Sequence, residues 1–299
     1  MSDDKEKIIK KKPFWNNIKV VPYLFILPNM ILFLAFMIIP LIMTGYYSLV
    51  KWNGIGKPKF IKLGNYLFIF KDSDFLTAIW NTVIFTVVTV PLMMAAAVFL
   101  AVLLNRKIHL RNFFRSAFYL PAIVSTVSIG MIFNWIFNSQ LGLMNYLIEL
   151  LHLHPIDWFN NGHYTMGMII LVTLWSRIGY NMVIYLASLQ GISPEYYEAA
   201  MLDGATEWQK FCYITFPLLK PTNVFVLITC VIYAFRSFDL IYVMTKGGPL
   251  NATTTLAVYI YNEAFSMNNF GRASASGVVL FLILLVFTIL QMKSNKENA

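Results

Sequence analysis

Six long apolar runs dominate the sequence, and their length is what most constrains its fold. A helix needs about 20 largely apolar residues to cross the hydrocarbon core of a bilayer. The stretches that meet this length are 23–49, 78–104, 114–137, 166–190, 218–244 and 273–292. They predict an all-α integral membrane protein with six transmembrane helices. Two of the runs contain Pro40 and Pro91, whose kinks neighbouring helices can absorb.

The composition agrees with a lipid environment. Only 12% of the residues are charged and 58% are hydrophobic, whereas soluble domains are about 25% charged. The net charge of +9 raises the question of nucleic acid binding, but the basic residues form no dense stripe with interleaved aromatic residues. The first apolar run is too long for a cleavable signal and lacks a small-residue cleavage site. We therefore expect it to remain as a span and expect no nucleic acid partner.

The distribution of Lys and Arg predicts the orientation in the membrane. With a cytoplasmic N-terminus, fourteen basic residues fall on the inner side and seven on the outer side. Cytoplasmic segments carry an excess of Lys and Arg, so both termini are predicted to be cytoplasmic. The sequence then divides into a basic cytoplasmic tail (1–22), one transmembrane domain (23–292) and a cytoplasmic C-terminal tail (293–299).

A polar loop at 193–217 lies between the fourth and fifth runs, on the cytoplasmic side. Ser193 is a typical helix N-cap, and Pro194 is tolerated at the first helical position. Gly204 can adopt the left-handed conformation that ends a helix. Thr206 followed by Gln209 forms a capping-box pattern. The loop is therefore predicted to fold as a helix, a tight glycine turn and a second helix.

The charges of this loop favour a protein partner over lipid. It carries Glu195, Glu198, Asp203 and Glu207, which anionic lipids would repel. Two small residues permit close approach, and four large side chains are of the kind found at interfaces: Ala199, Ala200, Tyr196, Tyr197, Met201 and Trp208. An amphipathic helix resting on lipid headgroups is the alternative.

The same loop carries a family resemblance. Glu198-Ala199-Ala200, three residues, Gly204, nine residues and then Ile214-Thr215-Phe216-Pro217 resembles the EAA loop of ABC importer permeases, with Phe216 where Leu is usual. Segments across the chain look like the carbohydrate-importer permeases, in particular the first permease subunit of the maltose and glycerol-phosphate type: "ILPNMILFLAFMIIPLI", "LGNY", "YLPAIVSTVSIGMIFNWIF", "TKGGP" and residues 271–277.

The resemblance implies a set of partners in a bacterial or archaeal cell membrane. These are a second related permease, two cytoplasmic ATPase subunits and an extracytoplasmic solute-binding protein. The first helix of the loop would be the coupling helix that docks in a cleft of the ATPase. The residues implied in this coupling are Glu198, Ala199, Ala200, Asp203, Gly204, Ala205 and Trp208. ATP and Mg would be bound by the ATPase, with no cofactor on this chain.

Catalytic and metal-binding motifs are missing from the sequence. It contains no G-x-x-x-x-G-K-[ST] phosphate loop, no H-E-x-x-H and no G-x-S-x-G, so we expect no enzyme activity. Cys212 and Cys230 fall at different predicted depths, which argues against a disulfide. His152 and His154 are interpreted as a solvated pair, with no metal site expected.

Ionisable and polar side chains inside the runs are candidates for a solute pathway, because buried charge in a membrane is costly. Arg177 lies in the fourth run, and Arg236 and Asp239 lie in the fifth with the spacing of a pair on one helix face. The candidate pathway residues are Asn134, Arg177, Asn181, Tyr233, Arg236 and Asp239. Each could instead serve helix packing alone.

The predicted function is the permease subunit of an ATP-driven importer of mono- or oligosaccharides, which forms half of the translocation pathway. An importer for another solute, such as glycerol phosphate, is the first alternative. A stand-alone secondary transporter or channel would give the EAA spacing no purpose. A membrane scaffold without transport would not need arginines inside its spans.

Overall fold

The computed structural model describes residues 21–106 and 109–297, and these are mostly helical. Most of the predicted basic tail (1–22) lies outside this range. Five helices are long and apolar enough to cross a membrane: Pro22–Tyr47, Ser73–Asn105, Gly162–Gln190, Lys220–Thr245 and Phe270–Lys293. Each overlaps one of the predicted runs, so five of the six predicted spans are confirmed.

The third predicted span, 114–137, is wrong as a single straight helix. Two helices, α5 (Arg111–Ile123) and α6 (Thr126–Ile136), meet there with a bend of 96°. Val124 and Ser125 have extended backbone torsions at the bend, and Pro121 just before them weakens the last turn of α5 because it donates no backbone hydrogen bond. Together the two helices can still form the third span, which brings the total to six.

Two of the remaining spans, the first and the fifth, depart locally from a regular helix. In the first, α1 (Val21–Phe33) and α2 (Ile39–Tyr47) are joined by a π-helical turn, η2 (Leu34–Ile38). The second is α4 (Ser73–Asn105) and the fourth α8 (Gly162–Gln190). The fifth is divided into α12 (Lys220–Phe235) and α13 (Asp239–Thr245), and the sixth is α15 (Phe270–Glu297).

The core of the bundle forms where α4 packs between α8 and α12, while α5 lies along α8. Gly179 of α8 makes the second of these contacts possible. A Cβ atom at Gly179 would overlap the backbone carbonyl of Phe118 in α5, far inside van der Waals distance. The absence of a side chain at this position therefore sets how closely α5 and α8 approach.

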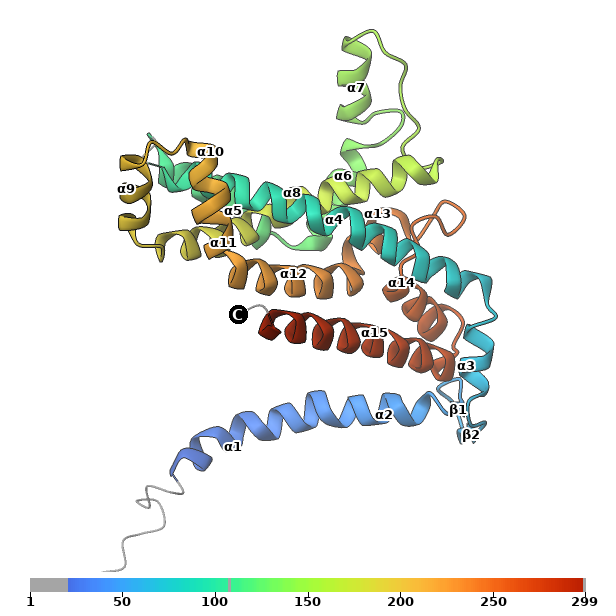
Figure 1. The fold of residues 1–299 in the computed structure, drawn as a ribbon. Coiled ribbons are helices and arrows are strands. Elements are labelled where there is room, and N and C mark those ends of the chain that lie inside the picture. The colour runs from blue at the N-terminus through green and yellow to red at the C-terminus, as the bar shows by residue number, and fades with distance from the viewer. Residues whose placement is uncertain (1–20, 107–108, 298–299) are drawn as a thin grey trace, which may run out of the picture.

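The first span stands apart from this core. Figure 1 shows α1 and α2 separated from the other helices except at the end of α2, which contacts α15. Its most apolar window is 0% buried, so its side chains are available to lipid or to another chain. A short hairpin, β1 (Val50–Lys51) and β2 (Lys59–Phe60), follows it with Val50 opposite Phe60.

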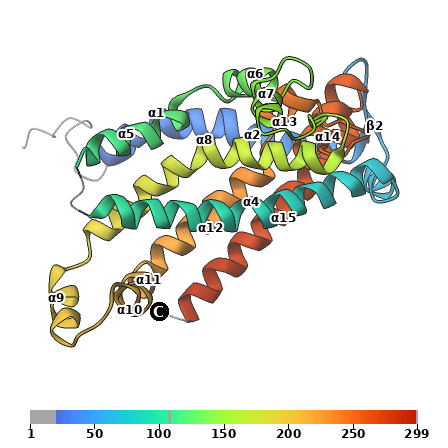
Figure 2. The same ribbon diagram turned by 90° about the horizontal axis from the view of Figure 1, so that it is seen from above.

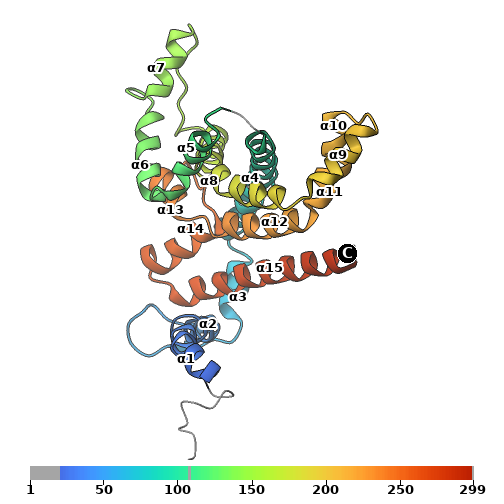
Figure 3. The ribbon, with the colours of Figure 1, turned by 90° about the vertical axis from the view of Figure 1, so that its left-hand side faces the viewer.

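The connecting elements gather at opposite ends of the bundle. Figure 2 shows α9 (Pro194–Leu202), α10 (Glu207–Lys210) and α11 (Phe216–Leu218) at one end, with the π-helical η3 (Phe211–Thr215) between the last two. The hairpin, α3 (Gly64–Ile69), α14 (Leu256–Tyr261) and η4 (Asn262–Ser266) lie at the other end. In Figure 3, α7 (Leu143–Leu150) projects sideways from the bundle, on the side away from α9. The end that carries α9 is the one predicted to be cytoplasmic.

Candidate coupling element and solute pathway

The polar loop begins as its sequence predicts. Ser193 is the N-cap of α9, and its hydroxyl accepts a hydrogen bond from the backbone N–H of Glu195 at 3.4 Å. Pro194 occupies the first helical position, where no hydrogen bond is lost. Glu195 lies in the first turn, where a negative charge is favoured by the helix dipole. Local capping therefore fixes where the helix starts.

The end of α9 is a Schellman motif. Gly204 has a φ of +76°, which glycine adopts without strain. The N–H of Ala205 donates to the carbonyl of Ala200 at 2.9 Å, and that of Gly204 donates to Met201 at 3.1 Å. This pair of bonds satisfies carbonyls that a helix end leaves free, and it turns the chain sharply toward α10.

The second helix has the predicted capping box. The Thr206 hydroxyl accepts from the Gln209 N–H at 3.3 Å, while the Gln209 side-chain oxygen accepts from the Thr206 N–H at 2.8 Å. The helix lasts only one turn before the backbone widens into η3. That π-helical turn had no signal in the sequence analysis. It leads through α11 into the fifth span.

Helix α9 makes few contacts with the rest of the described chain. None of its side chains is buried, and the side chains of Glu198, Ala199 and Asp203 are exposed. One hydrogen bond ties the helix to η3, between the hydroxyls of Tyr197 and Thr215 at 3.0 Å. The side of α9 that carries Glu198 is therefore available to another molecule.

An ion triad joins α10 to the end of the second span. Glu207 accepts from Arg106 at 3.0 Å and also pairs with Lys210. The hydrogen bond from Lys210 lowers the pKa of Glu207, and the nearby charge of Arg106 lowers it further. Because Arg106 and Glu207 are both more than half exposed, the energetic value of this surface pair is small. The pair joins α10 to the end of α4 in this structure.

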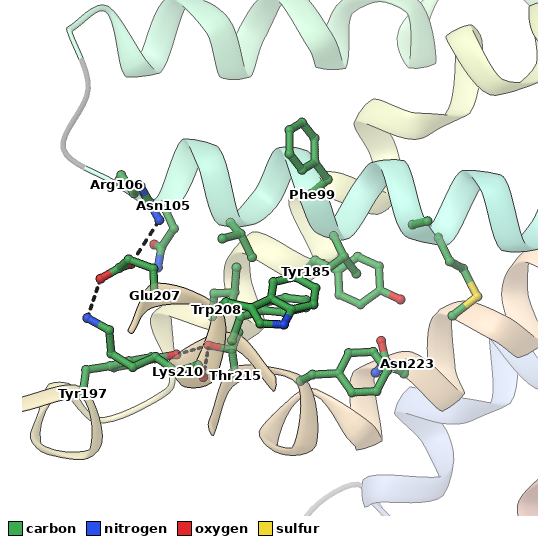
Figure 4. A pocket seen from close by; sticks show the side chains of 17 residues that line it. Phe99, Asn105, Arg106, Tyr185, Tyr197, Glu207, Trp208, Lys210, Thr215 and Asn223 are labelled. Atoms are coloured by element: carbon green, nitrogen blue, oxygen red, sulfur yellow. Dashed lines mark hydrogen bonds and ion pairs between the residues drawn. The ribbon is translucent and has the colours of Figure 1, made fainter. Parts of the chain in front are cut away.

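Trp208 turns toward the bundle, although its ring remains 71% exposed. The ring stacks on Phe211 with a centroid distance of 5.6 Å. Figure 4 shows both this tryptophan and the ion triad at a cavity that α4 and α8 also line. Of the predicted coupling residues, Trp208 is thus the one that faces the membrane domain.

Two of the predicted pathway residues are in direct contact. The Arg177 guanidinium of α8 lies over the ring of Tyr233 in α12, with its carbon 4.2 Å from the ring centroid. Such a cation–π contact is worth about 0.5–2 kcal/mol. Both side chains are half-buried, so the pair joins the fourth and fifth spans and still presents polar atoms to a neighbour.

The two asparagines of the candidate pathway have structural contacts. Asn134 of α6 donates to the carbonyl of Met244 in α13 at 3.2 Å. Asn181 is buried in α8 and donates weakly to the carbonyl of Arg177, one turn earlier, at 3.4 Å. Asn134 thus ties the third run to the fifth.

The predicted pairing of Arg236 with Asp239 is wrong. The ion pairs among the described residues involve Arg106, Glu207 and Lys210 instead. The helix breaks between Phe235 and Asp239, so the two side chains do not share one helix face. At the break, the Thr255 hydroxyl donates to the carbonyl of Ser237 at 3.3 Å. Arg236 and Asp239 are both exposed.

A polar connection that was not predicted joins the second span to the loop before the last span. Asn81 donates to the carbonyls of Asn251 and Thr254 at 2.8 and 3.0 Å. The Thr82 hydroxyl accepts from the N–H of Leu256 at 2.8 Å. These partners are 170 to 174 residues away in the sequence. The polar residues near the start of an apolar run were therefore the only available signal.

The cysteines are free, as predicted: Cys212 is partly exposed and Cys230 is buried. Within residues 21–106 and 109–297, no cluster of three or more His, Cys, Asp or Glu side chains has an arrangement that could hold a metal ion.

Comparison with known proteins settles the family. A family model described as "Binding-protein-dependent transport system inner membrane component" matches residues 93–296, which is more than half of the chain. The chain belongs to this family. The matched region contains the coupling element and every candidate pathway residue of the permease. The family match also removes the alternatives of a secondary transporter and a scaffold.

Similar proteins come from carbohydrate and glycerol-phosphate importers. The permease is 36% identical to the arabinooligosaccharides transport system permease protein AraP of Bacillus subtilis (strain 168), over 92% of this chain and 88% of that one. It is 36% identical to the lactose transport system permease protein LacF of Rhizobium radiobacter, over 92% and 94% of the two chains. It is 34% identical to the sn-glycerol-3-phosphate permease UgpA of Brucella abortus, with the same coverages.

A solved structure has the same fold. The permease aligns with a bacterial ABC transporter involved in the import of the acidic polysaccharide alginate, with a TM-score of 0.83, 23% identity and coverage of 96% and 99% of the two chains. Family, relatives and fold confirm the predicted resemblance, and the chain is a multi-pass membrane permease of the carbohydrate ABC importers. The roles of individual residues stay predictions.

Proposed function

We propose that the permease is one of two related membrane subunits of an ATP-driven importer for mono- or oligosaccharides. It forms half of the translocation pathway and couples to a cytoplasmic ATPase through α9. An extracytoplasmic binding protein delivers the solute; one solved relative is in complex with an alginate pentasaccharide-bound periplasmic protein. The chain lies in a bacterial or archaeal cell membrane with both termini in the cytoplasm. ATP and Mg are bound by the ATPase, and the chain carries no cofactor.

The observation that carries this proposal is the exposed acidic side of α9. The helix is capped at both ends, contains none of the buried residues of the core and presents Glu198 beside two alanines. A short helix with no buried residue and one side-chain hydrogen bond to its own chain gains much of its stability from a partner. The alanines allow a second surface to approach closely, and Glu198 offers a charge to a basic residue in that surface.

Purification of the assembly tests the proposal directly. Solubilised in a mild detergent from its native host, the permease is expected to bring down a second permease and an ATPase. The purified assembly should hydrolyse ATP faster when binding protein and solute are added together. A permease that transports solute when reconstituted alone would contradict the proposal.

A second test concerns the candidate pathway. Arg177→Ala is expected to lower the uptake rate at limiting solute by about tenfold or more, because the guanidinium beside Tyr233 would no longer orient the solute. Uptake of labelled sugar in membrane vesicles measures this as a change in KM. Tyr233→Phe keeps the cation–π contact but removes the hydroxyl, so it separates a polar contact with solute from helix packing.

Arg272→Ala is the matched control. Arg272 makes a comparable contact over the ring of Phe68, 3.4 Å from the centroid, at the start of α15. We expect its loss to affect stability without changing the KM. Equal kinetic effects of Arg177→Ala and Arg272→Ala would assign Arg177 to packing alone.

A phosphorylated solute is the second candidate. The exposed Arg236 has no ion pair among the described residues, and together with Arg177 it could offer positive charge to an anion. The adjacent exposed Asp239 opposes this. Competition of labelled sugar uptake by glycerol phosphate, compared with competition by unlabelled oligosaccharides, discriminates between the two.

A further inference from the structure

A cavity of about 990 Å³ lies beside the coupling element. Its walls are the last third of α4, the end of α8, the beginning of α12 and the segment from α10 to α11 (Figure 4). This volume is at the upper end of the range typical of ligand sites, about 300–1,000 Å³. The cavity therefore has room for a large organic molecule.

The walls of the cavity are mainly apolar. Aliphatic and aromatic side chains from both sides line it, among them Ala95, Val98, Phe99, Val102, Phe211 and Phe216. Water gains few hydrogen bonds against such walls, whereas a hydrocarbon chain that fills them removes apolar surface from water. The shape and chemistry of the walls favour an apolar chain as the occupant.

The mouth of the cavity is charged. It is formed by Arg106, Glu207 and Lys210, which together carry a net charge of +1. Only one guanidinium nitrogen of Arg106 is used in the pair with Glu207, and an arginine has five N–H donors. The rim therefore keeps free donors for an anionic oxygen, and phosphate is a group that arginine binds well.

The wall of the cavity contains a buried hydroxyl group without a hydrogen-bond partner. Tyr185 of α8 is fully buried, its ring lines the cavity (Figure 4), and its hydroxyl has no hydrogen-bond partner. A buried hydroxyl without a partner has lost the hydrogen bonds that it makes in water and gained none in return. Tyr185 lies five residues before the end of α8 at Gln190, which is about 7.5 Å along a helix. A ligand with an acceptor at this depth would satisfy it.

The position of the cavity along the spans matches the headgroup region. Its charged mouth is at the residue that directly follows α4, where a membrane-crossing helix ends. Arg111 and Arg115 lie in the first turns of the neighbouring α5, so positive charge is concentrated at this end. Basic clusters next to a membrane helix attract anionic lipids.

We propose that this cavity binds an anionic glycerophospholipid of the cytoplasmic leaflet. One acyl chain lies between α4 and η3, the phosphate binds at Arg106 and Lys210, and an ester carbonyl accepts from the Tyr185 hydroxyl. The lipid thereby connects α4 to α10 beside the coupling helix. The assignment to the cytoplasmic leaflet rests on the proposed orientation. The carboxylate at the rim does not oppose it, because Glu207 of α10 is already paired with two cations.

Photolabelling in membrane vesicles tests the site. Phosphatidylglycerol with a diazirine in one acyl chain is added to inverted vesicles that contain the full importer, and labelled peptides are mapped by mass spectrometry. Labels are expected at residues 94–102 and 208–216, at least fivefold more than with the matching phosphatidylcholine. Arg106→Gln should remove that headgroup preference while the chain still labels the walls.

Filling the cavity supplies the matched comparison. Ala95→Trp should reduce labelling of these segments at least tenfold, and Ala95→Phe serves the same purpose if the larger ring prevents insertion. Val87→Trp places the same ring on an exposed position of α4 that does not line the cavity, and it should leave labelling within twofold. Equal labelling in Ala95→Trp and Val87→Trp, or no label in either segment, would overturn the proposal.

Right-side-out vesicles and a protein crosslinker separate the remaining outcomes. Labelling that occurs only from right-side-out vesicles would overturn the orientation in the proposed function and leave the lipid site standing, in the opposite leaflet. A photoreactive amino acid at Val102 that captures a second polypeptide instead of phospholipid would show that a protein helix fills the cavity, and would overturn the lipid assignment.

Discussion

Replacing Glu198 with lysine is expected to abolish ATP-driven uptake while the permease still inserts and folds. Glu198 is exposed on α9 and makes no hydrogen bond or ion pair within the described chain that would be lost. In the proposed complex its carboxylate is buried against a basic residue of the ATPase, and breaking such a pair costs about 3–5 kcal/mol. Every 1.4 kcal/mol is a factor of ten, so the ATPase should bind on the order of 100-fold more weakly or worse.

The measurement is solute uptake together with the amount of ATPase that copurifies. Glu195→Lys is the control, because Glu195 is on the same helix, one turn earlier, and is also exposed. Reversing the charge at position 195 removes a favourable interaction with the helix dipole, worth about 0.3–1 kcal/mol. This variant should therefore keep most of its uptake. Normal uptake by Glu198→Lys, or equal losses in both variants, would remove Glu198 from the coupling contact.

The parts of the coupling element that could be predicted are those set by residues close together in the sequence. Caps and turns are set by residues two to six positions apart, so Ser193, Gly204 and Thr206 predicted the boundaries of α9 and the start of α10. The π-helical η3 was missed because its widened turn has no comparable residue signature. A regular helix was the reasonable expectation for an apolar segment leading into a span.

The spans show the same limit on a larger scale. Apolar length predicted where the chain crosses the membrane, since length and hydropathy are properties of the segment itself. The bend at Val124 and Ser125, however, was not predicted, because Pro121 alone allows either a kinked helix or a break. At the break between Arg236 and Asp239, Thr255 likewise binds the backbone from a loop 18 residues beyond Ser237. Spacing along one helix could not foresee a contact supplied by a distant loop.

Contacts between distant segments also carry the functional argument. Arg106 and Glu207 are 101 residues apart, and Arg177 meets Tyr233 across two different spans. The sequence can single out one residue of each pair by its polar or charged side chain, but only the fold shows which residue it contacts. The candidate pathway was therefore a set of separate residues until the structure brought two of them together.

These contacts suggest how motion at α9 reaches the membrane domain. The hydrogen bond between Tyr197 and Thr215 ties α9 to η3, which leads into the fifth span. The pair between Arg106 and Glu207 ties α10 to the end of the second span. A displacement of α9 by the ATPase would thus be passed to two spans at once, and the cavity between them would change shape as they move.

The close contact between α5 and α8 gives the second large effect. Gly179→Ala is expected to destabilise the permease by about 3 kcal/mol, at the upper end of the cost of overpacking. The added methyl group would overlap the backbone carbonyl of Phe118, and a backbone atom cannot rotate away as the end of a flexible side chain can. The two helices must therefore move apart, with loss of the contacts along their length.

Gly167→Ala is a control within the same helix, because a Cβ atom there has nothing within 4 Å. Alanine is favoured over glycine inside a helix by about 1 kcal/mol, so this variant should be neutral or more stable. Thermal unfolding of the purified permease in detergent measures both changes. Opposite signs for the same substitution in one helix would show that packing against α5 decides the outcome, whereas equal stability of the two variants would mean that α5 does not approach α8 as closely as the structure has it.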